Sequence, residues 1–221
     1  MIQQFSKGFI FMRKKYNNKI LELIRSLQNI DYIKPDEIPN IDLYMDQVTT
    51  FMDEHLSSSK RFEEDKILTK TMINNYTKNN LLPPPEKKKY SKEHILLLIY
   101  IYYLKNFLAI SDIKNILDPI SEHFFDSSGN KKLDDIYKEI VELELENMDS
   151  QLRDIIRKLN KSNNFYSDVE DPEEKEVLSN FAFICMLSFD VWVKKNIIEN
   201  IIDDTLGKKK DENKNDTVKK K

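Results

Sequence analysis

The residues best suited to chemistry lie in one short polar segment that follows Thr69. Thr69 can cap a helix, and five polar side chains then recur in an i, i+1, i+4, i+5, i+8 pattern that shares one helix face. They are Lys70, Thr71, Asn74, Asn75 and Lys78, and no acidic residue stands among them. Asn amides can pair bidentately with adenine, a Thr methyl can contact thymine, and lysines can neutralise phosphates. The pattern predicts a helix surface that contacts duplex DNA.

A second basic group stands just beyond this helix. Pro83-Pro84-Pro85 must end the helix by Leu82, because proline lacks a backbone donor and forces the preceding residue out of the helical region. Lys87, Lys88 and Lys89 follow in a row. We expect these lysines to hold DNA phosphates beside the polar helix face.

The distribution of charge supports this interpretation more than the net charge does. The 221 residues carry a formal net charge of -3, but residues 66–92 hold 7 basic and 1 acidic side chains, whereas residues 93–206 hold 12 basic and 23 acidic ones. A basic segment beside an acidic body is typical of a DNA-contacting element. A solvated face in a lysine-rich protein is the alternative explanation.

Hydrophobic periodicity predicts the helices that must position these residues. We expect one helix over 20–30 and a second, capped by Asn40, with an apolar face from Ile41 to Leu56. A capping-box-like start at Ser91 opens a long apolar helix, in which His94 takes the place of the usual Glu or Gln. A shorter helix follows from Ser111 and closes at Asp118-Pro119.

Two long helices are expected in the C-terminal part, over 133–159 and 172–206. The first has a coiled-coil-like seam from Val141 to Leu159, and the second is apolar nearly all round between Phe181 and Val193, so other helices must wrap it. This excess of apolar surface predicts either a homodimer or a compact monomer in which the helices fold back onto 20–30 and 95–108.

Catalytic, metal and cofactor chemistry find no support in the sequence. The histidines His55, His94 and His123 are isolated, Cys185 is the one cysteine, and 3 glycines are too few for phosphate-cradling loops. The carboxylate pairs Asp134-Asp135 and Asp203-Asp204 diverge on a helix. We therefore expect no catalytic residue, no metal and no cofactor, and hence no enzyme.

A membrane protein is not expected either. The most apolar stretches, Ile95–Leu104 and Phe181–Phe189, are each about ten residues long, about half of what a membrane span needs. We interpret both as buried core helices. A reducing cytoplasm suits the single thiol best.

Several of these features together resemble a MerR-type winged helix-turn-helix. The resemblance rests on four features: the polar helix, the Asn80-Leu81-Leu82-Pro83-Pro84 segment that follows it, the basic link to Tyr90-Ser91, and residues 113–117 at the end of the domain. Asn80 stands where that family has glycine, Tyr76 matches the second of its paired aromatics, Asn75 replaces the first, and Asn74 replaces a phosphate-contacting arginine. The stretch from about Ile30 to Leu117 also resembles an uncharacterised domain-of-unknown-function family of low-GC Gram-positive bacteria, described as MerR-like.

The resemblance implies an all-α protein with a MerR-like winged helix-turn-helix followed by a C-terminal helical body. Lys87 to Lys89 would form a short wing, and Tyr90 would match its terminal tyrosine and join the DNA-contacting set. The expected organisation is an N-terminal helix over 1–34, the helix-turn-helix domain over 35–118, the helical body over 119–206, and a disordered basic tail over 207–221. The function expected is a transcriptional regulator that binds double-stranded DNA, and the alternative is a helical protein-interaction or adaptor module.

Overall fold

The computed structural model describes residues 20, 22–23, 33–126 and 129–206, and these fall into two compact units. One unit, here named the α2–α5 unit, comprises Ile33–Glu139 together with the segment from Lys195 onward, and the other, the hairpin unit, contains the described stretch Ile140–Lys194. The expected tail over 207–221 lies outside the described residues, as does the expected N-terminal helix apart from Ile20, Glu22 and Leu23.

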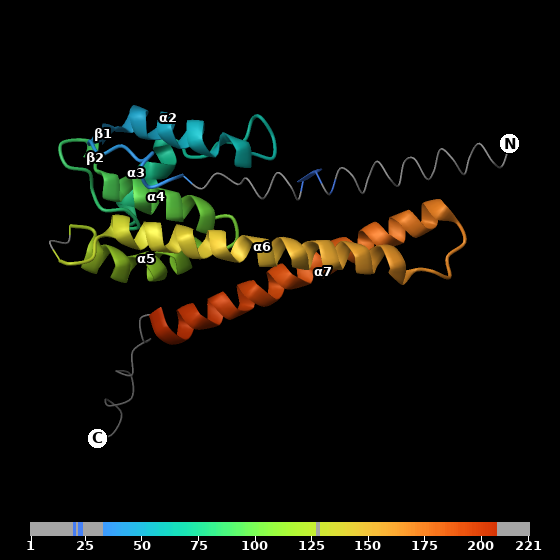
Figure 1. Cartoon of the computed structure of the whole chain (residues 1–221). Helices are drawn as coiled ribbons and strands as arrows, with labels where there is room; N and C mark the ends of the chain where they lie inside the picture. Colours follow the sequence, from blue (N-terminus) through green and yellow to red (C-terminus); the bar gives the residue numbers. More distant parts are fainter. Residues whose placement is uncertain (1–19, 21, 24–32, 127–128, 207–221) are drawn as a thin grey trace, which may run out of the picture. The chain divides into compact units, whose positions relative to one another are not determined.

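The α2–α5 unit is built mainly of helices, as the sequence predicts (Figure 1). Its elements are β1 (Leu43–Tyr44), α2 (Met45–Leu56), the short helix η1 (Ser57–Ser59), α3 (Lys70–Lys78), β2 (Lys89–Tyr90), α4 (Lys92–Leu104), α5 (Ile110–Phe124), the first turns of α6 (Leu133–Phe165) and the final turn η2 (Ile202–Leu206). The predominantly helical class is therefore confirmed, and two strands of two residues each accompany the helices.

Helix α4 forms the core of this unit. Every side chain from His94 to Ile99 is buried, and so is Ile101, because the helix is apolar on all sides and must be covered on all sides. The first turns of α6 close one side of it. The Tyr100 and Tyr137 rings meet edge to face at 5.8 Å, and Lys92 Nζ pairs with Asp134 Oδ1 at 2.8 Å.

The start of α2 differs from the sequence prediction. The helix begins at Met45 instead of after Asn40, and the Tyr44 backbone N–H donates to Gln47 Oε1 at 2.8 Å. Leu43 and Tyr44 pair as a strand with Tyr90 and Lys89 of β2. Ile41 and Tyr44 therefore point to solvent, while the predicted inner face from Val48 to Leu56 is buried. The cross-strand pairing, which is non-local in sequence, holds these residues extended.

The end of α5 also differs from the prediction. The helix starts after Ala109 and runs through Pro119 to Phe124, so Asp118-Pro119 does not close it. Proline removes one helical hydrogen bond, but a helix can continue through it when packing holds the chain in place. Ile113 and Leu117 are buried in the turns before the proline, and η2 packs against the same helix. The α2–α5 unit thus extends past the expected boundary at residue 118, to Glu139.

The hairpin unit consists of α6 from Ile140 onward and of α7 (Pro172–Ile201) as far as Lys194 (Figure 1). Lys158 of α6 forms ion pairs with both Asp154 and Asp190, the second of which lies on α7. Val141, Leu152 and Leu159 of the predicted seam are buried, whereas Leu145 is exposed.

Helix α7 is not wrapped by the described residues, which contradicts the sequence prediction. Its buried side chains between Pro172 and Ile201 are Ser179 and Phe183. The exposed large apolar ones between the same bounds are Val177, Phe181, Ile184, Phe189, Val191, Trp192, Ile197 and Ile201. The interpretation of Phe181–Phe189 as a buried core helix is therefore wrong, while that of Ile95–Leu104 is confirmed.

By length and composition alone, the helical stretch Pro172–Leu206 is apolar enough to cross a membrane. Its most apolar 18-residue window has a mean hydropathy of 1.5, and 11% of that window is buried. The apolar run Phe181–Phe189 is interrupted by Asp190, but the helix continues with the apolar residues Val191, Trp192 and Val193. The run up to Phe189 alone is therefore shorter than the apolar stretch of the whole helix.

A strained turn joins the prolines to β2. The Lys89 N–H donates to the Glu86 carbonyl at 2.9 Å, and the two central residues Lys87 and Lys88 have φ of 50° and 66°. Positive φ at both central positions is the pattern of a type I′ turn, which favours Asn-Gly, and a residue with a Cβ costs about 1–2 kcal/mol there.

A buried histidine completes the N-terminal cap of α4. The Ser91 backbone N–H donates to His94 Nδ1 at 3.0 Å, so His94 does the work of the Glu or Gln of a capping box. The imidazole packs edge to face against Tyr90 and Phe125. Burial lowers the pKa of His94 below its ordinary value of 6.5.

The turn generates a stability prediction. Changing Lys87→Asn together with Lys88→Gly should raise the free energy of unfolding by about 1 kcal/mol or more, because both residues tolerate positive φ better than lysine. Denaturant unfolding of the full chain measures the change. A neutral or lower stability would show that the turn is not strained.

The histidine generates a pH prediction. The pKa of His94 is lower in the folded state than in the unfolded state, so at a pH between the two values the unfolded state binds more protons. The free energy of unfolding that His94 contributes is therefore fully present above about pH 6.5 and is lost as the pH falls through the pKa of the folded state. His94→Gln keeps an acceptor for the Ser91 N–H and cannot titrate. Its free energy of unfolding should therefore fall less than that of the wild type between about pH 7.5 and about pH 5.5. Equal losses in the two proteins would remove His94 as the source.

Candidate nucleic-acid interface

Helix α3 presents the predicted polar face to solvent. The Thr69 hydroxyl accepts the Met72 N–H at 3.2 Å, which fixes the first turn, and Ile73 and Tyr76 anchor the opposite side in the core. All five predicted contact residues of this helix are exposed: Lys70, Thr71, Asn74, Asn75 and Lys78. The structure therefore brings them together on one accessible surface, here named the α3 face.

The end of α3 is fixed by a left-handed residue. Asn80 has φ of 54°, and the N–H groups of Leu81 and Leu82 both donate to the Tyr76 carbonyl, at 2.8 and 3.2 Å. Asn tolerates this conformation best after glycine, because its short polar side chain can hydrogen-bond locally. The Lys114 ammonium donates to the Asn80 carbonyl at 2.7 Å and ties the turn to α5. The conformation explains how Asn80 can occupy a position where glycine was expected from the resemblance.

One lysine of the α3 face has a nearby carboxylate. Lys70 pairs with Asp46 in the first turn of α2, and both side chains stay more than half exposed. An exposed pair of this kind contributes little to stability, so Asp46 mainly lowers the local positive potential. Sequence reasoning missed Asp46, since nothing in the local pattern shows that α2 begins beside α3.

The lysines beyond the helix are presented in two different ways. Lys87 and Lys88 stand at the tip of the turn and are exposed, and Lys87 has a loose pair with Glu86 at 3.8 Å. Lys89 lies on β2, where its ammonium is 5.4 Å from the centre of the Tyr44 ring. Two of the three predicted phosphate ligands are thus at the tip and one is on the strand.

Tyr90 is placed inside the fold. Its side chain is 3% exposed, and its ring meets the His94 ring at 5.4 Å. Burial raises the pKa values of Tyr90 and Tyr76, so both hydroxyls stay neutral at ordinary pH. Tyr90 therefore positions β2 and is not part of the exposed surface that DNA could contact.

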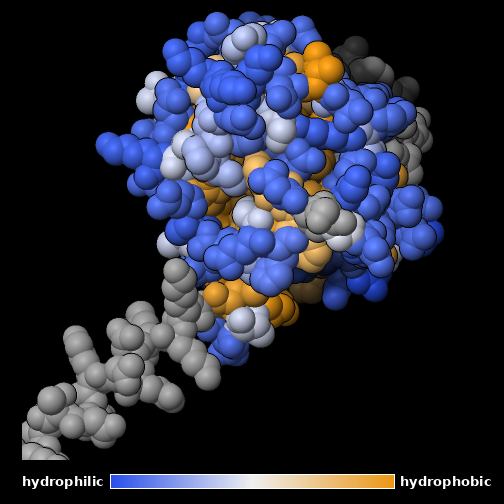
Figure 2. Space-filling view, turned by 90° about the vertical axis from the view of Figure 1, so that its left-hand side faces the viewer, coloured by the Kyte–Doolittle hydropathy of each residue, from blue (hydrophilic) through white to orange (hydrophobic). Residues whose placement is uncertain are grey.

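Helix α2 holds both basic elements in place. It contacts α3 and β2, and β1, which pairs with β2, leads directly into it. The buried face from Val48 to Leu56 anchors α2 in the core. The α3 face and the turn Glu86–Lys89 are therefore fixed to one rigid element of the same unit. The surface that faces the viewer in Figure 2 is mostly hydrophilic, with apolar patches near its middle and at its lower edge.

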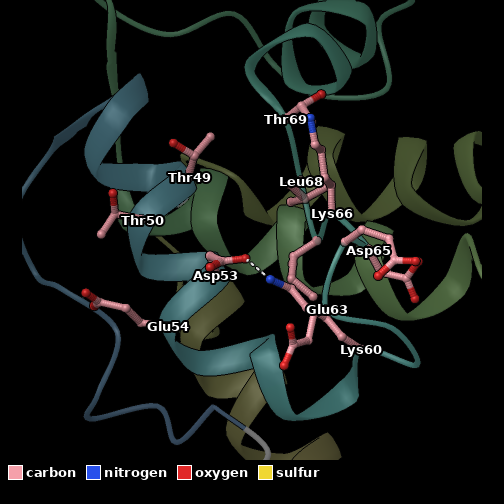
Figure 3. A pocket seen from close by; sticks show the side chains of 12 residues that line it. Thr49, Thr50, Asp53, Glu54, Lys60, Glu63, Asp65, Lys66, Leu68 and Thr69 are labelled. Atoms are coloured by element: carbon pink, nitrogen blue, oxygen red, sulfur yellow. Dashed lines mark ion pairs between the residues drawn. The ribbon is translucent and has the colours of Figure 1, made fainter.

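An acidic groove adjoins the start of α3. It has a volume of about 740 Å³, and Figure 3 shows its side chains, which come from α2 and from the connector that precedes Thr69. Five of its residues are acidic: Asp53, Glu54, Glu63, Glu64 and Asp65. Lys60 and Lys66 also line the groove and offset part of this charge, Lys60 through a 2.6 Å pair with Asp53. Phosphates would be repelled here, so the groove limits the directions from which a nucleic acid can approach α3.

Within the described residues, no group of three or more His, Cys, Asp or Glu side chains could hold a metal ion. Asp134 is used structurally, since Lys92 and Lys138 both pair with it. The geometry of the α2–α5 unit offers a polar, partly basic surface.

Comparison with known proteins gives one similarity, which covers most of the α2–α5 unit. No curated protein and no solved structure matches the chain. Residues 33–140, however, match the model of a domain of unknown function (DUF1836), and these bounds agree closely with the Ile33–Glu139 part of the α2–α5 unit. The part of the chain that carries the α3 face and the turn is thus similar to an uncharacterised domain family.

Proposed function

We propose that the α2–α5 unit binds double-stranded DNA and that the protein acts as a transcriptional regulator in the cytoplasm. The α3 face would enter the major groove, and Lys87 and Lys88 would hold phosphates beside it. The observation that carries the proposal is the exposed, acid-free set of Lys, Thr and Asn side chains on a helix whose other side is buried. These residue types can read base edges and hold phosphates at once.

The strained turn adds independent support. Two lysines occupy consecutive left-handed positions at which Asn-Gly would be more stable. Strain of this kind persists where the side chains have a function that offsets the loss of stability. A pair of exposed ammonium groups at a turn tip can neutralise phosphates, and the ion pair of Lys87 with Glu86 is loose, at 3.8 Å.

The acidic groove gives the proposed complex a direction. A duplex that lies across the α3 face and the turn must keep its phosphates away from Glu63, Glu64 and Asp65. This favours an approach from the side of Asn74, Asn75 and Lys78 over one from the Thr69 end of the helix. The same repulsion would weaken nonspecific binding and so sharpen the choice of site.

A protein-interaction module is the second candidate function. The observation that favours it is the large exposed apolar surface of α7, which a soluble monomer rarely displays. A retardation assay with mixed genomic DNA at two salt concentrations separates the candidates. DNA binding that falls steeply with salt supports the first, and no retardation at low salt contradicts it.

The turn lysines should set part of the salt dependence. Lys87→Asn with Lys88→Gly removes two phosphate contacts without adding strain, so DNA binding should weaken on all sequences and the salt slope should fall by up to about two. Lys132→Gln with Arg153→Gln removes the same charge from exposed positions outside the α3 face, the turn and the acidic groove, and should leave the slope unchanged. The turn would have no role in binding if both double variants behaved alike.

Asn74 and Asn75 should set the sequence preference. Replacing each with Ala should weaken binding to the preferred site by about 1–3 kcal/mol and binding to unrelated DNA much less, because bidentate base contacts discriminate while backbone contacts do not. Competition assays with selected and random duplexes measure the difference. An equal loss on both would mean that the two residues touch only the DNA backbone.

A further inference from the structure

The exposed side of α7 forms a continuous apolar face. At 100° per residue, six side chains fall within an arc of about 100°, on the side of the helix away from Lys158 of α6. They are Val177, Phe181, Ile184, Cys185, Ser188 and Trp192, here named the α7 face, and all six are exposed. Asp190 is the one charged residue from Val177 to Val193, and it is turned toward α6, where it pairs with Lys158.

This face is large for a surface left open to water. Phe181, Phe189 and Trp192 are 63%, 62% and 60% exposed, and Phe189, which lies beside the face, stacks on Trp192 at 5.6 Å. At about 150–250 Å² for each aromatic side chain, these three alone display on the order of 300 to 400 Å², which already equals the largest apolar patch of a typical monomer. An open hollow of about 370 Å³ adjoins them, lined by Phe165, Phe181 and Met186 among others.

The order of residues along α7 makes this face complementary to itself in the antiparallel direction. If a twofold axis crosses the helix between Ile184 and Cys185, each position i meets the position 369 minus i of the second copy. Phe181 then lies opposite Ser188, a large side chain against a small one, and Val177 lies opposite Trp192. Interdigitation of large and small side chains is what packed helices require.

The charges at the two ends follow the same symmetry. Glu174 near the start of α7 lies opposite Lys195 near its end. Lys195 pairs within its helix with Glu199 at 3.6 Å and stays partly exposed, so it can accept a second acidic partner. In a parallel arrangement Glu174 would meet Glu174 and Lys195 would meet Lys195. The antiparallel register alone joins opposite charges at both ends.

We infer that the α7 face docks against the α7 face of a second copy of this chain, antiparallel, with the twofold axis between Ile184 and Cys185. Such an isologous contact uses one patch on both partners. A lipid surface fits less well, because the acidic Glu173, Glu174 and Glu176 at one end would be repelled by anionic headgroups, and the Lys158–Asp190 pairs hold α7 to the charged helix α6. The inference does not depend on DNA binding.

Association is tested first. Sedimentation of the full chain at tens of micromolar should give twice the 26.3 kDa mass of one chain. Phe181→Glu should raise the dissociation constant at least about tenfold. Leu143→Glu, which changes an equally exposed residue of α6, should leave it unchanged, and circular dichroism of both variants reports that they fold.

The register is tested by crosslinking and charge reversal. The shortest bis-maleimide should join two copies through Cys185 in the wild-type chain. In Cys185→Ser with Glu174→Cys, the two thiols would stand about 30 Å apart and should not be joined. Glu174→Lys should weaken association, and adding Lys195→Glu should restore it.

Three results would overturn the proposal. One is a monomeric full chain whose Cys185 resists maleimide, since another segment of the same chain would then cover the face. Another is crosslinking at residue 174 as efficient as at residue 185, which would mean a parallel contact. The last is a monomer that floats with vesicles of phosphatidylcholine and phosphatidylglycerol, which would assign the face to a membrane.

Discussion

The α2–α5 unit depends on the burial of α4. From His94 to Ile99 this helix has no side that tolerates water, so it needs neighbours all round it. The first turns of α6 supply one of these neighbours through Tyr137. The Tyr137 hydroxyl also donates to the Ile33 carbonyl at 2.6 Å, which ties the segment before β1 to the core. The strand β2 supplies another, and β2 pairs with β1 at the start of α2. The positions of α3 and of the turn Glu86–Lys89 follow from this packing.

Helix starts and exposed helix faces in the α2–α5 unit could be predicted from the sequence, because they depend on residues close together in the chain. Thr69 caps α3, Ser91 precedes α4, and the α3 face is exposed as its spacing indicated. Such features depend on residues three or four positions apart, which are visible in the sequence. The sequence shows His94 where a capping box usually has Glu or Gln. In the structure its Nδ1 accepts the Ser91 N–H, as the side chain of Glu or Gln would.

Features that depend on distant residues were not predictable in the same way. The pairing of Leu43 with Tyr90 joins segments almost fifty residues apart and displaced the expected start of α2 from Asn40 to Tyr44. The Lys70–Asp46 pair and the acidic groove have the same origin, because only the packing of α2 beside α3 brings their residues together. The resemblance matched Tyr90 to a DNA-contacting tyrosine, but in the structure Tyr90 is buried and holds β2 in place. Composition alone cannot tell an apolar helix that is covered, such as α4, from one that is exposed, such as α7.

We propose that the α3 face and the turn contact duplex DNA. The most direct measurement is the change in backbone amide chemical shifts when a mixed-sequence duplex is added to the isotope-labelled full chain at low salt. We expect shifts at Thr71, Asn74, Lys87 and Lys88, and none at Glu63 or Asp65 in the acidic groove. Shifts confined to the hairpin unit, or no shifts at all, would contradict it.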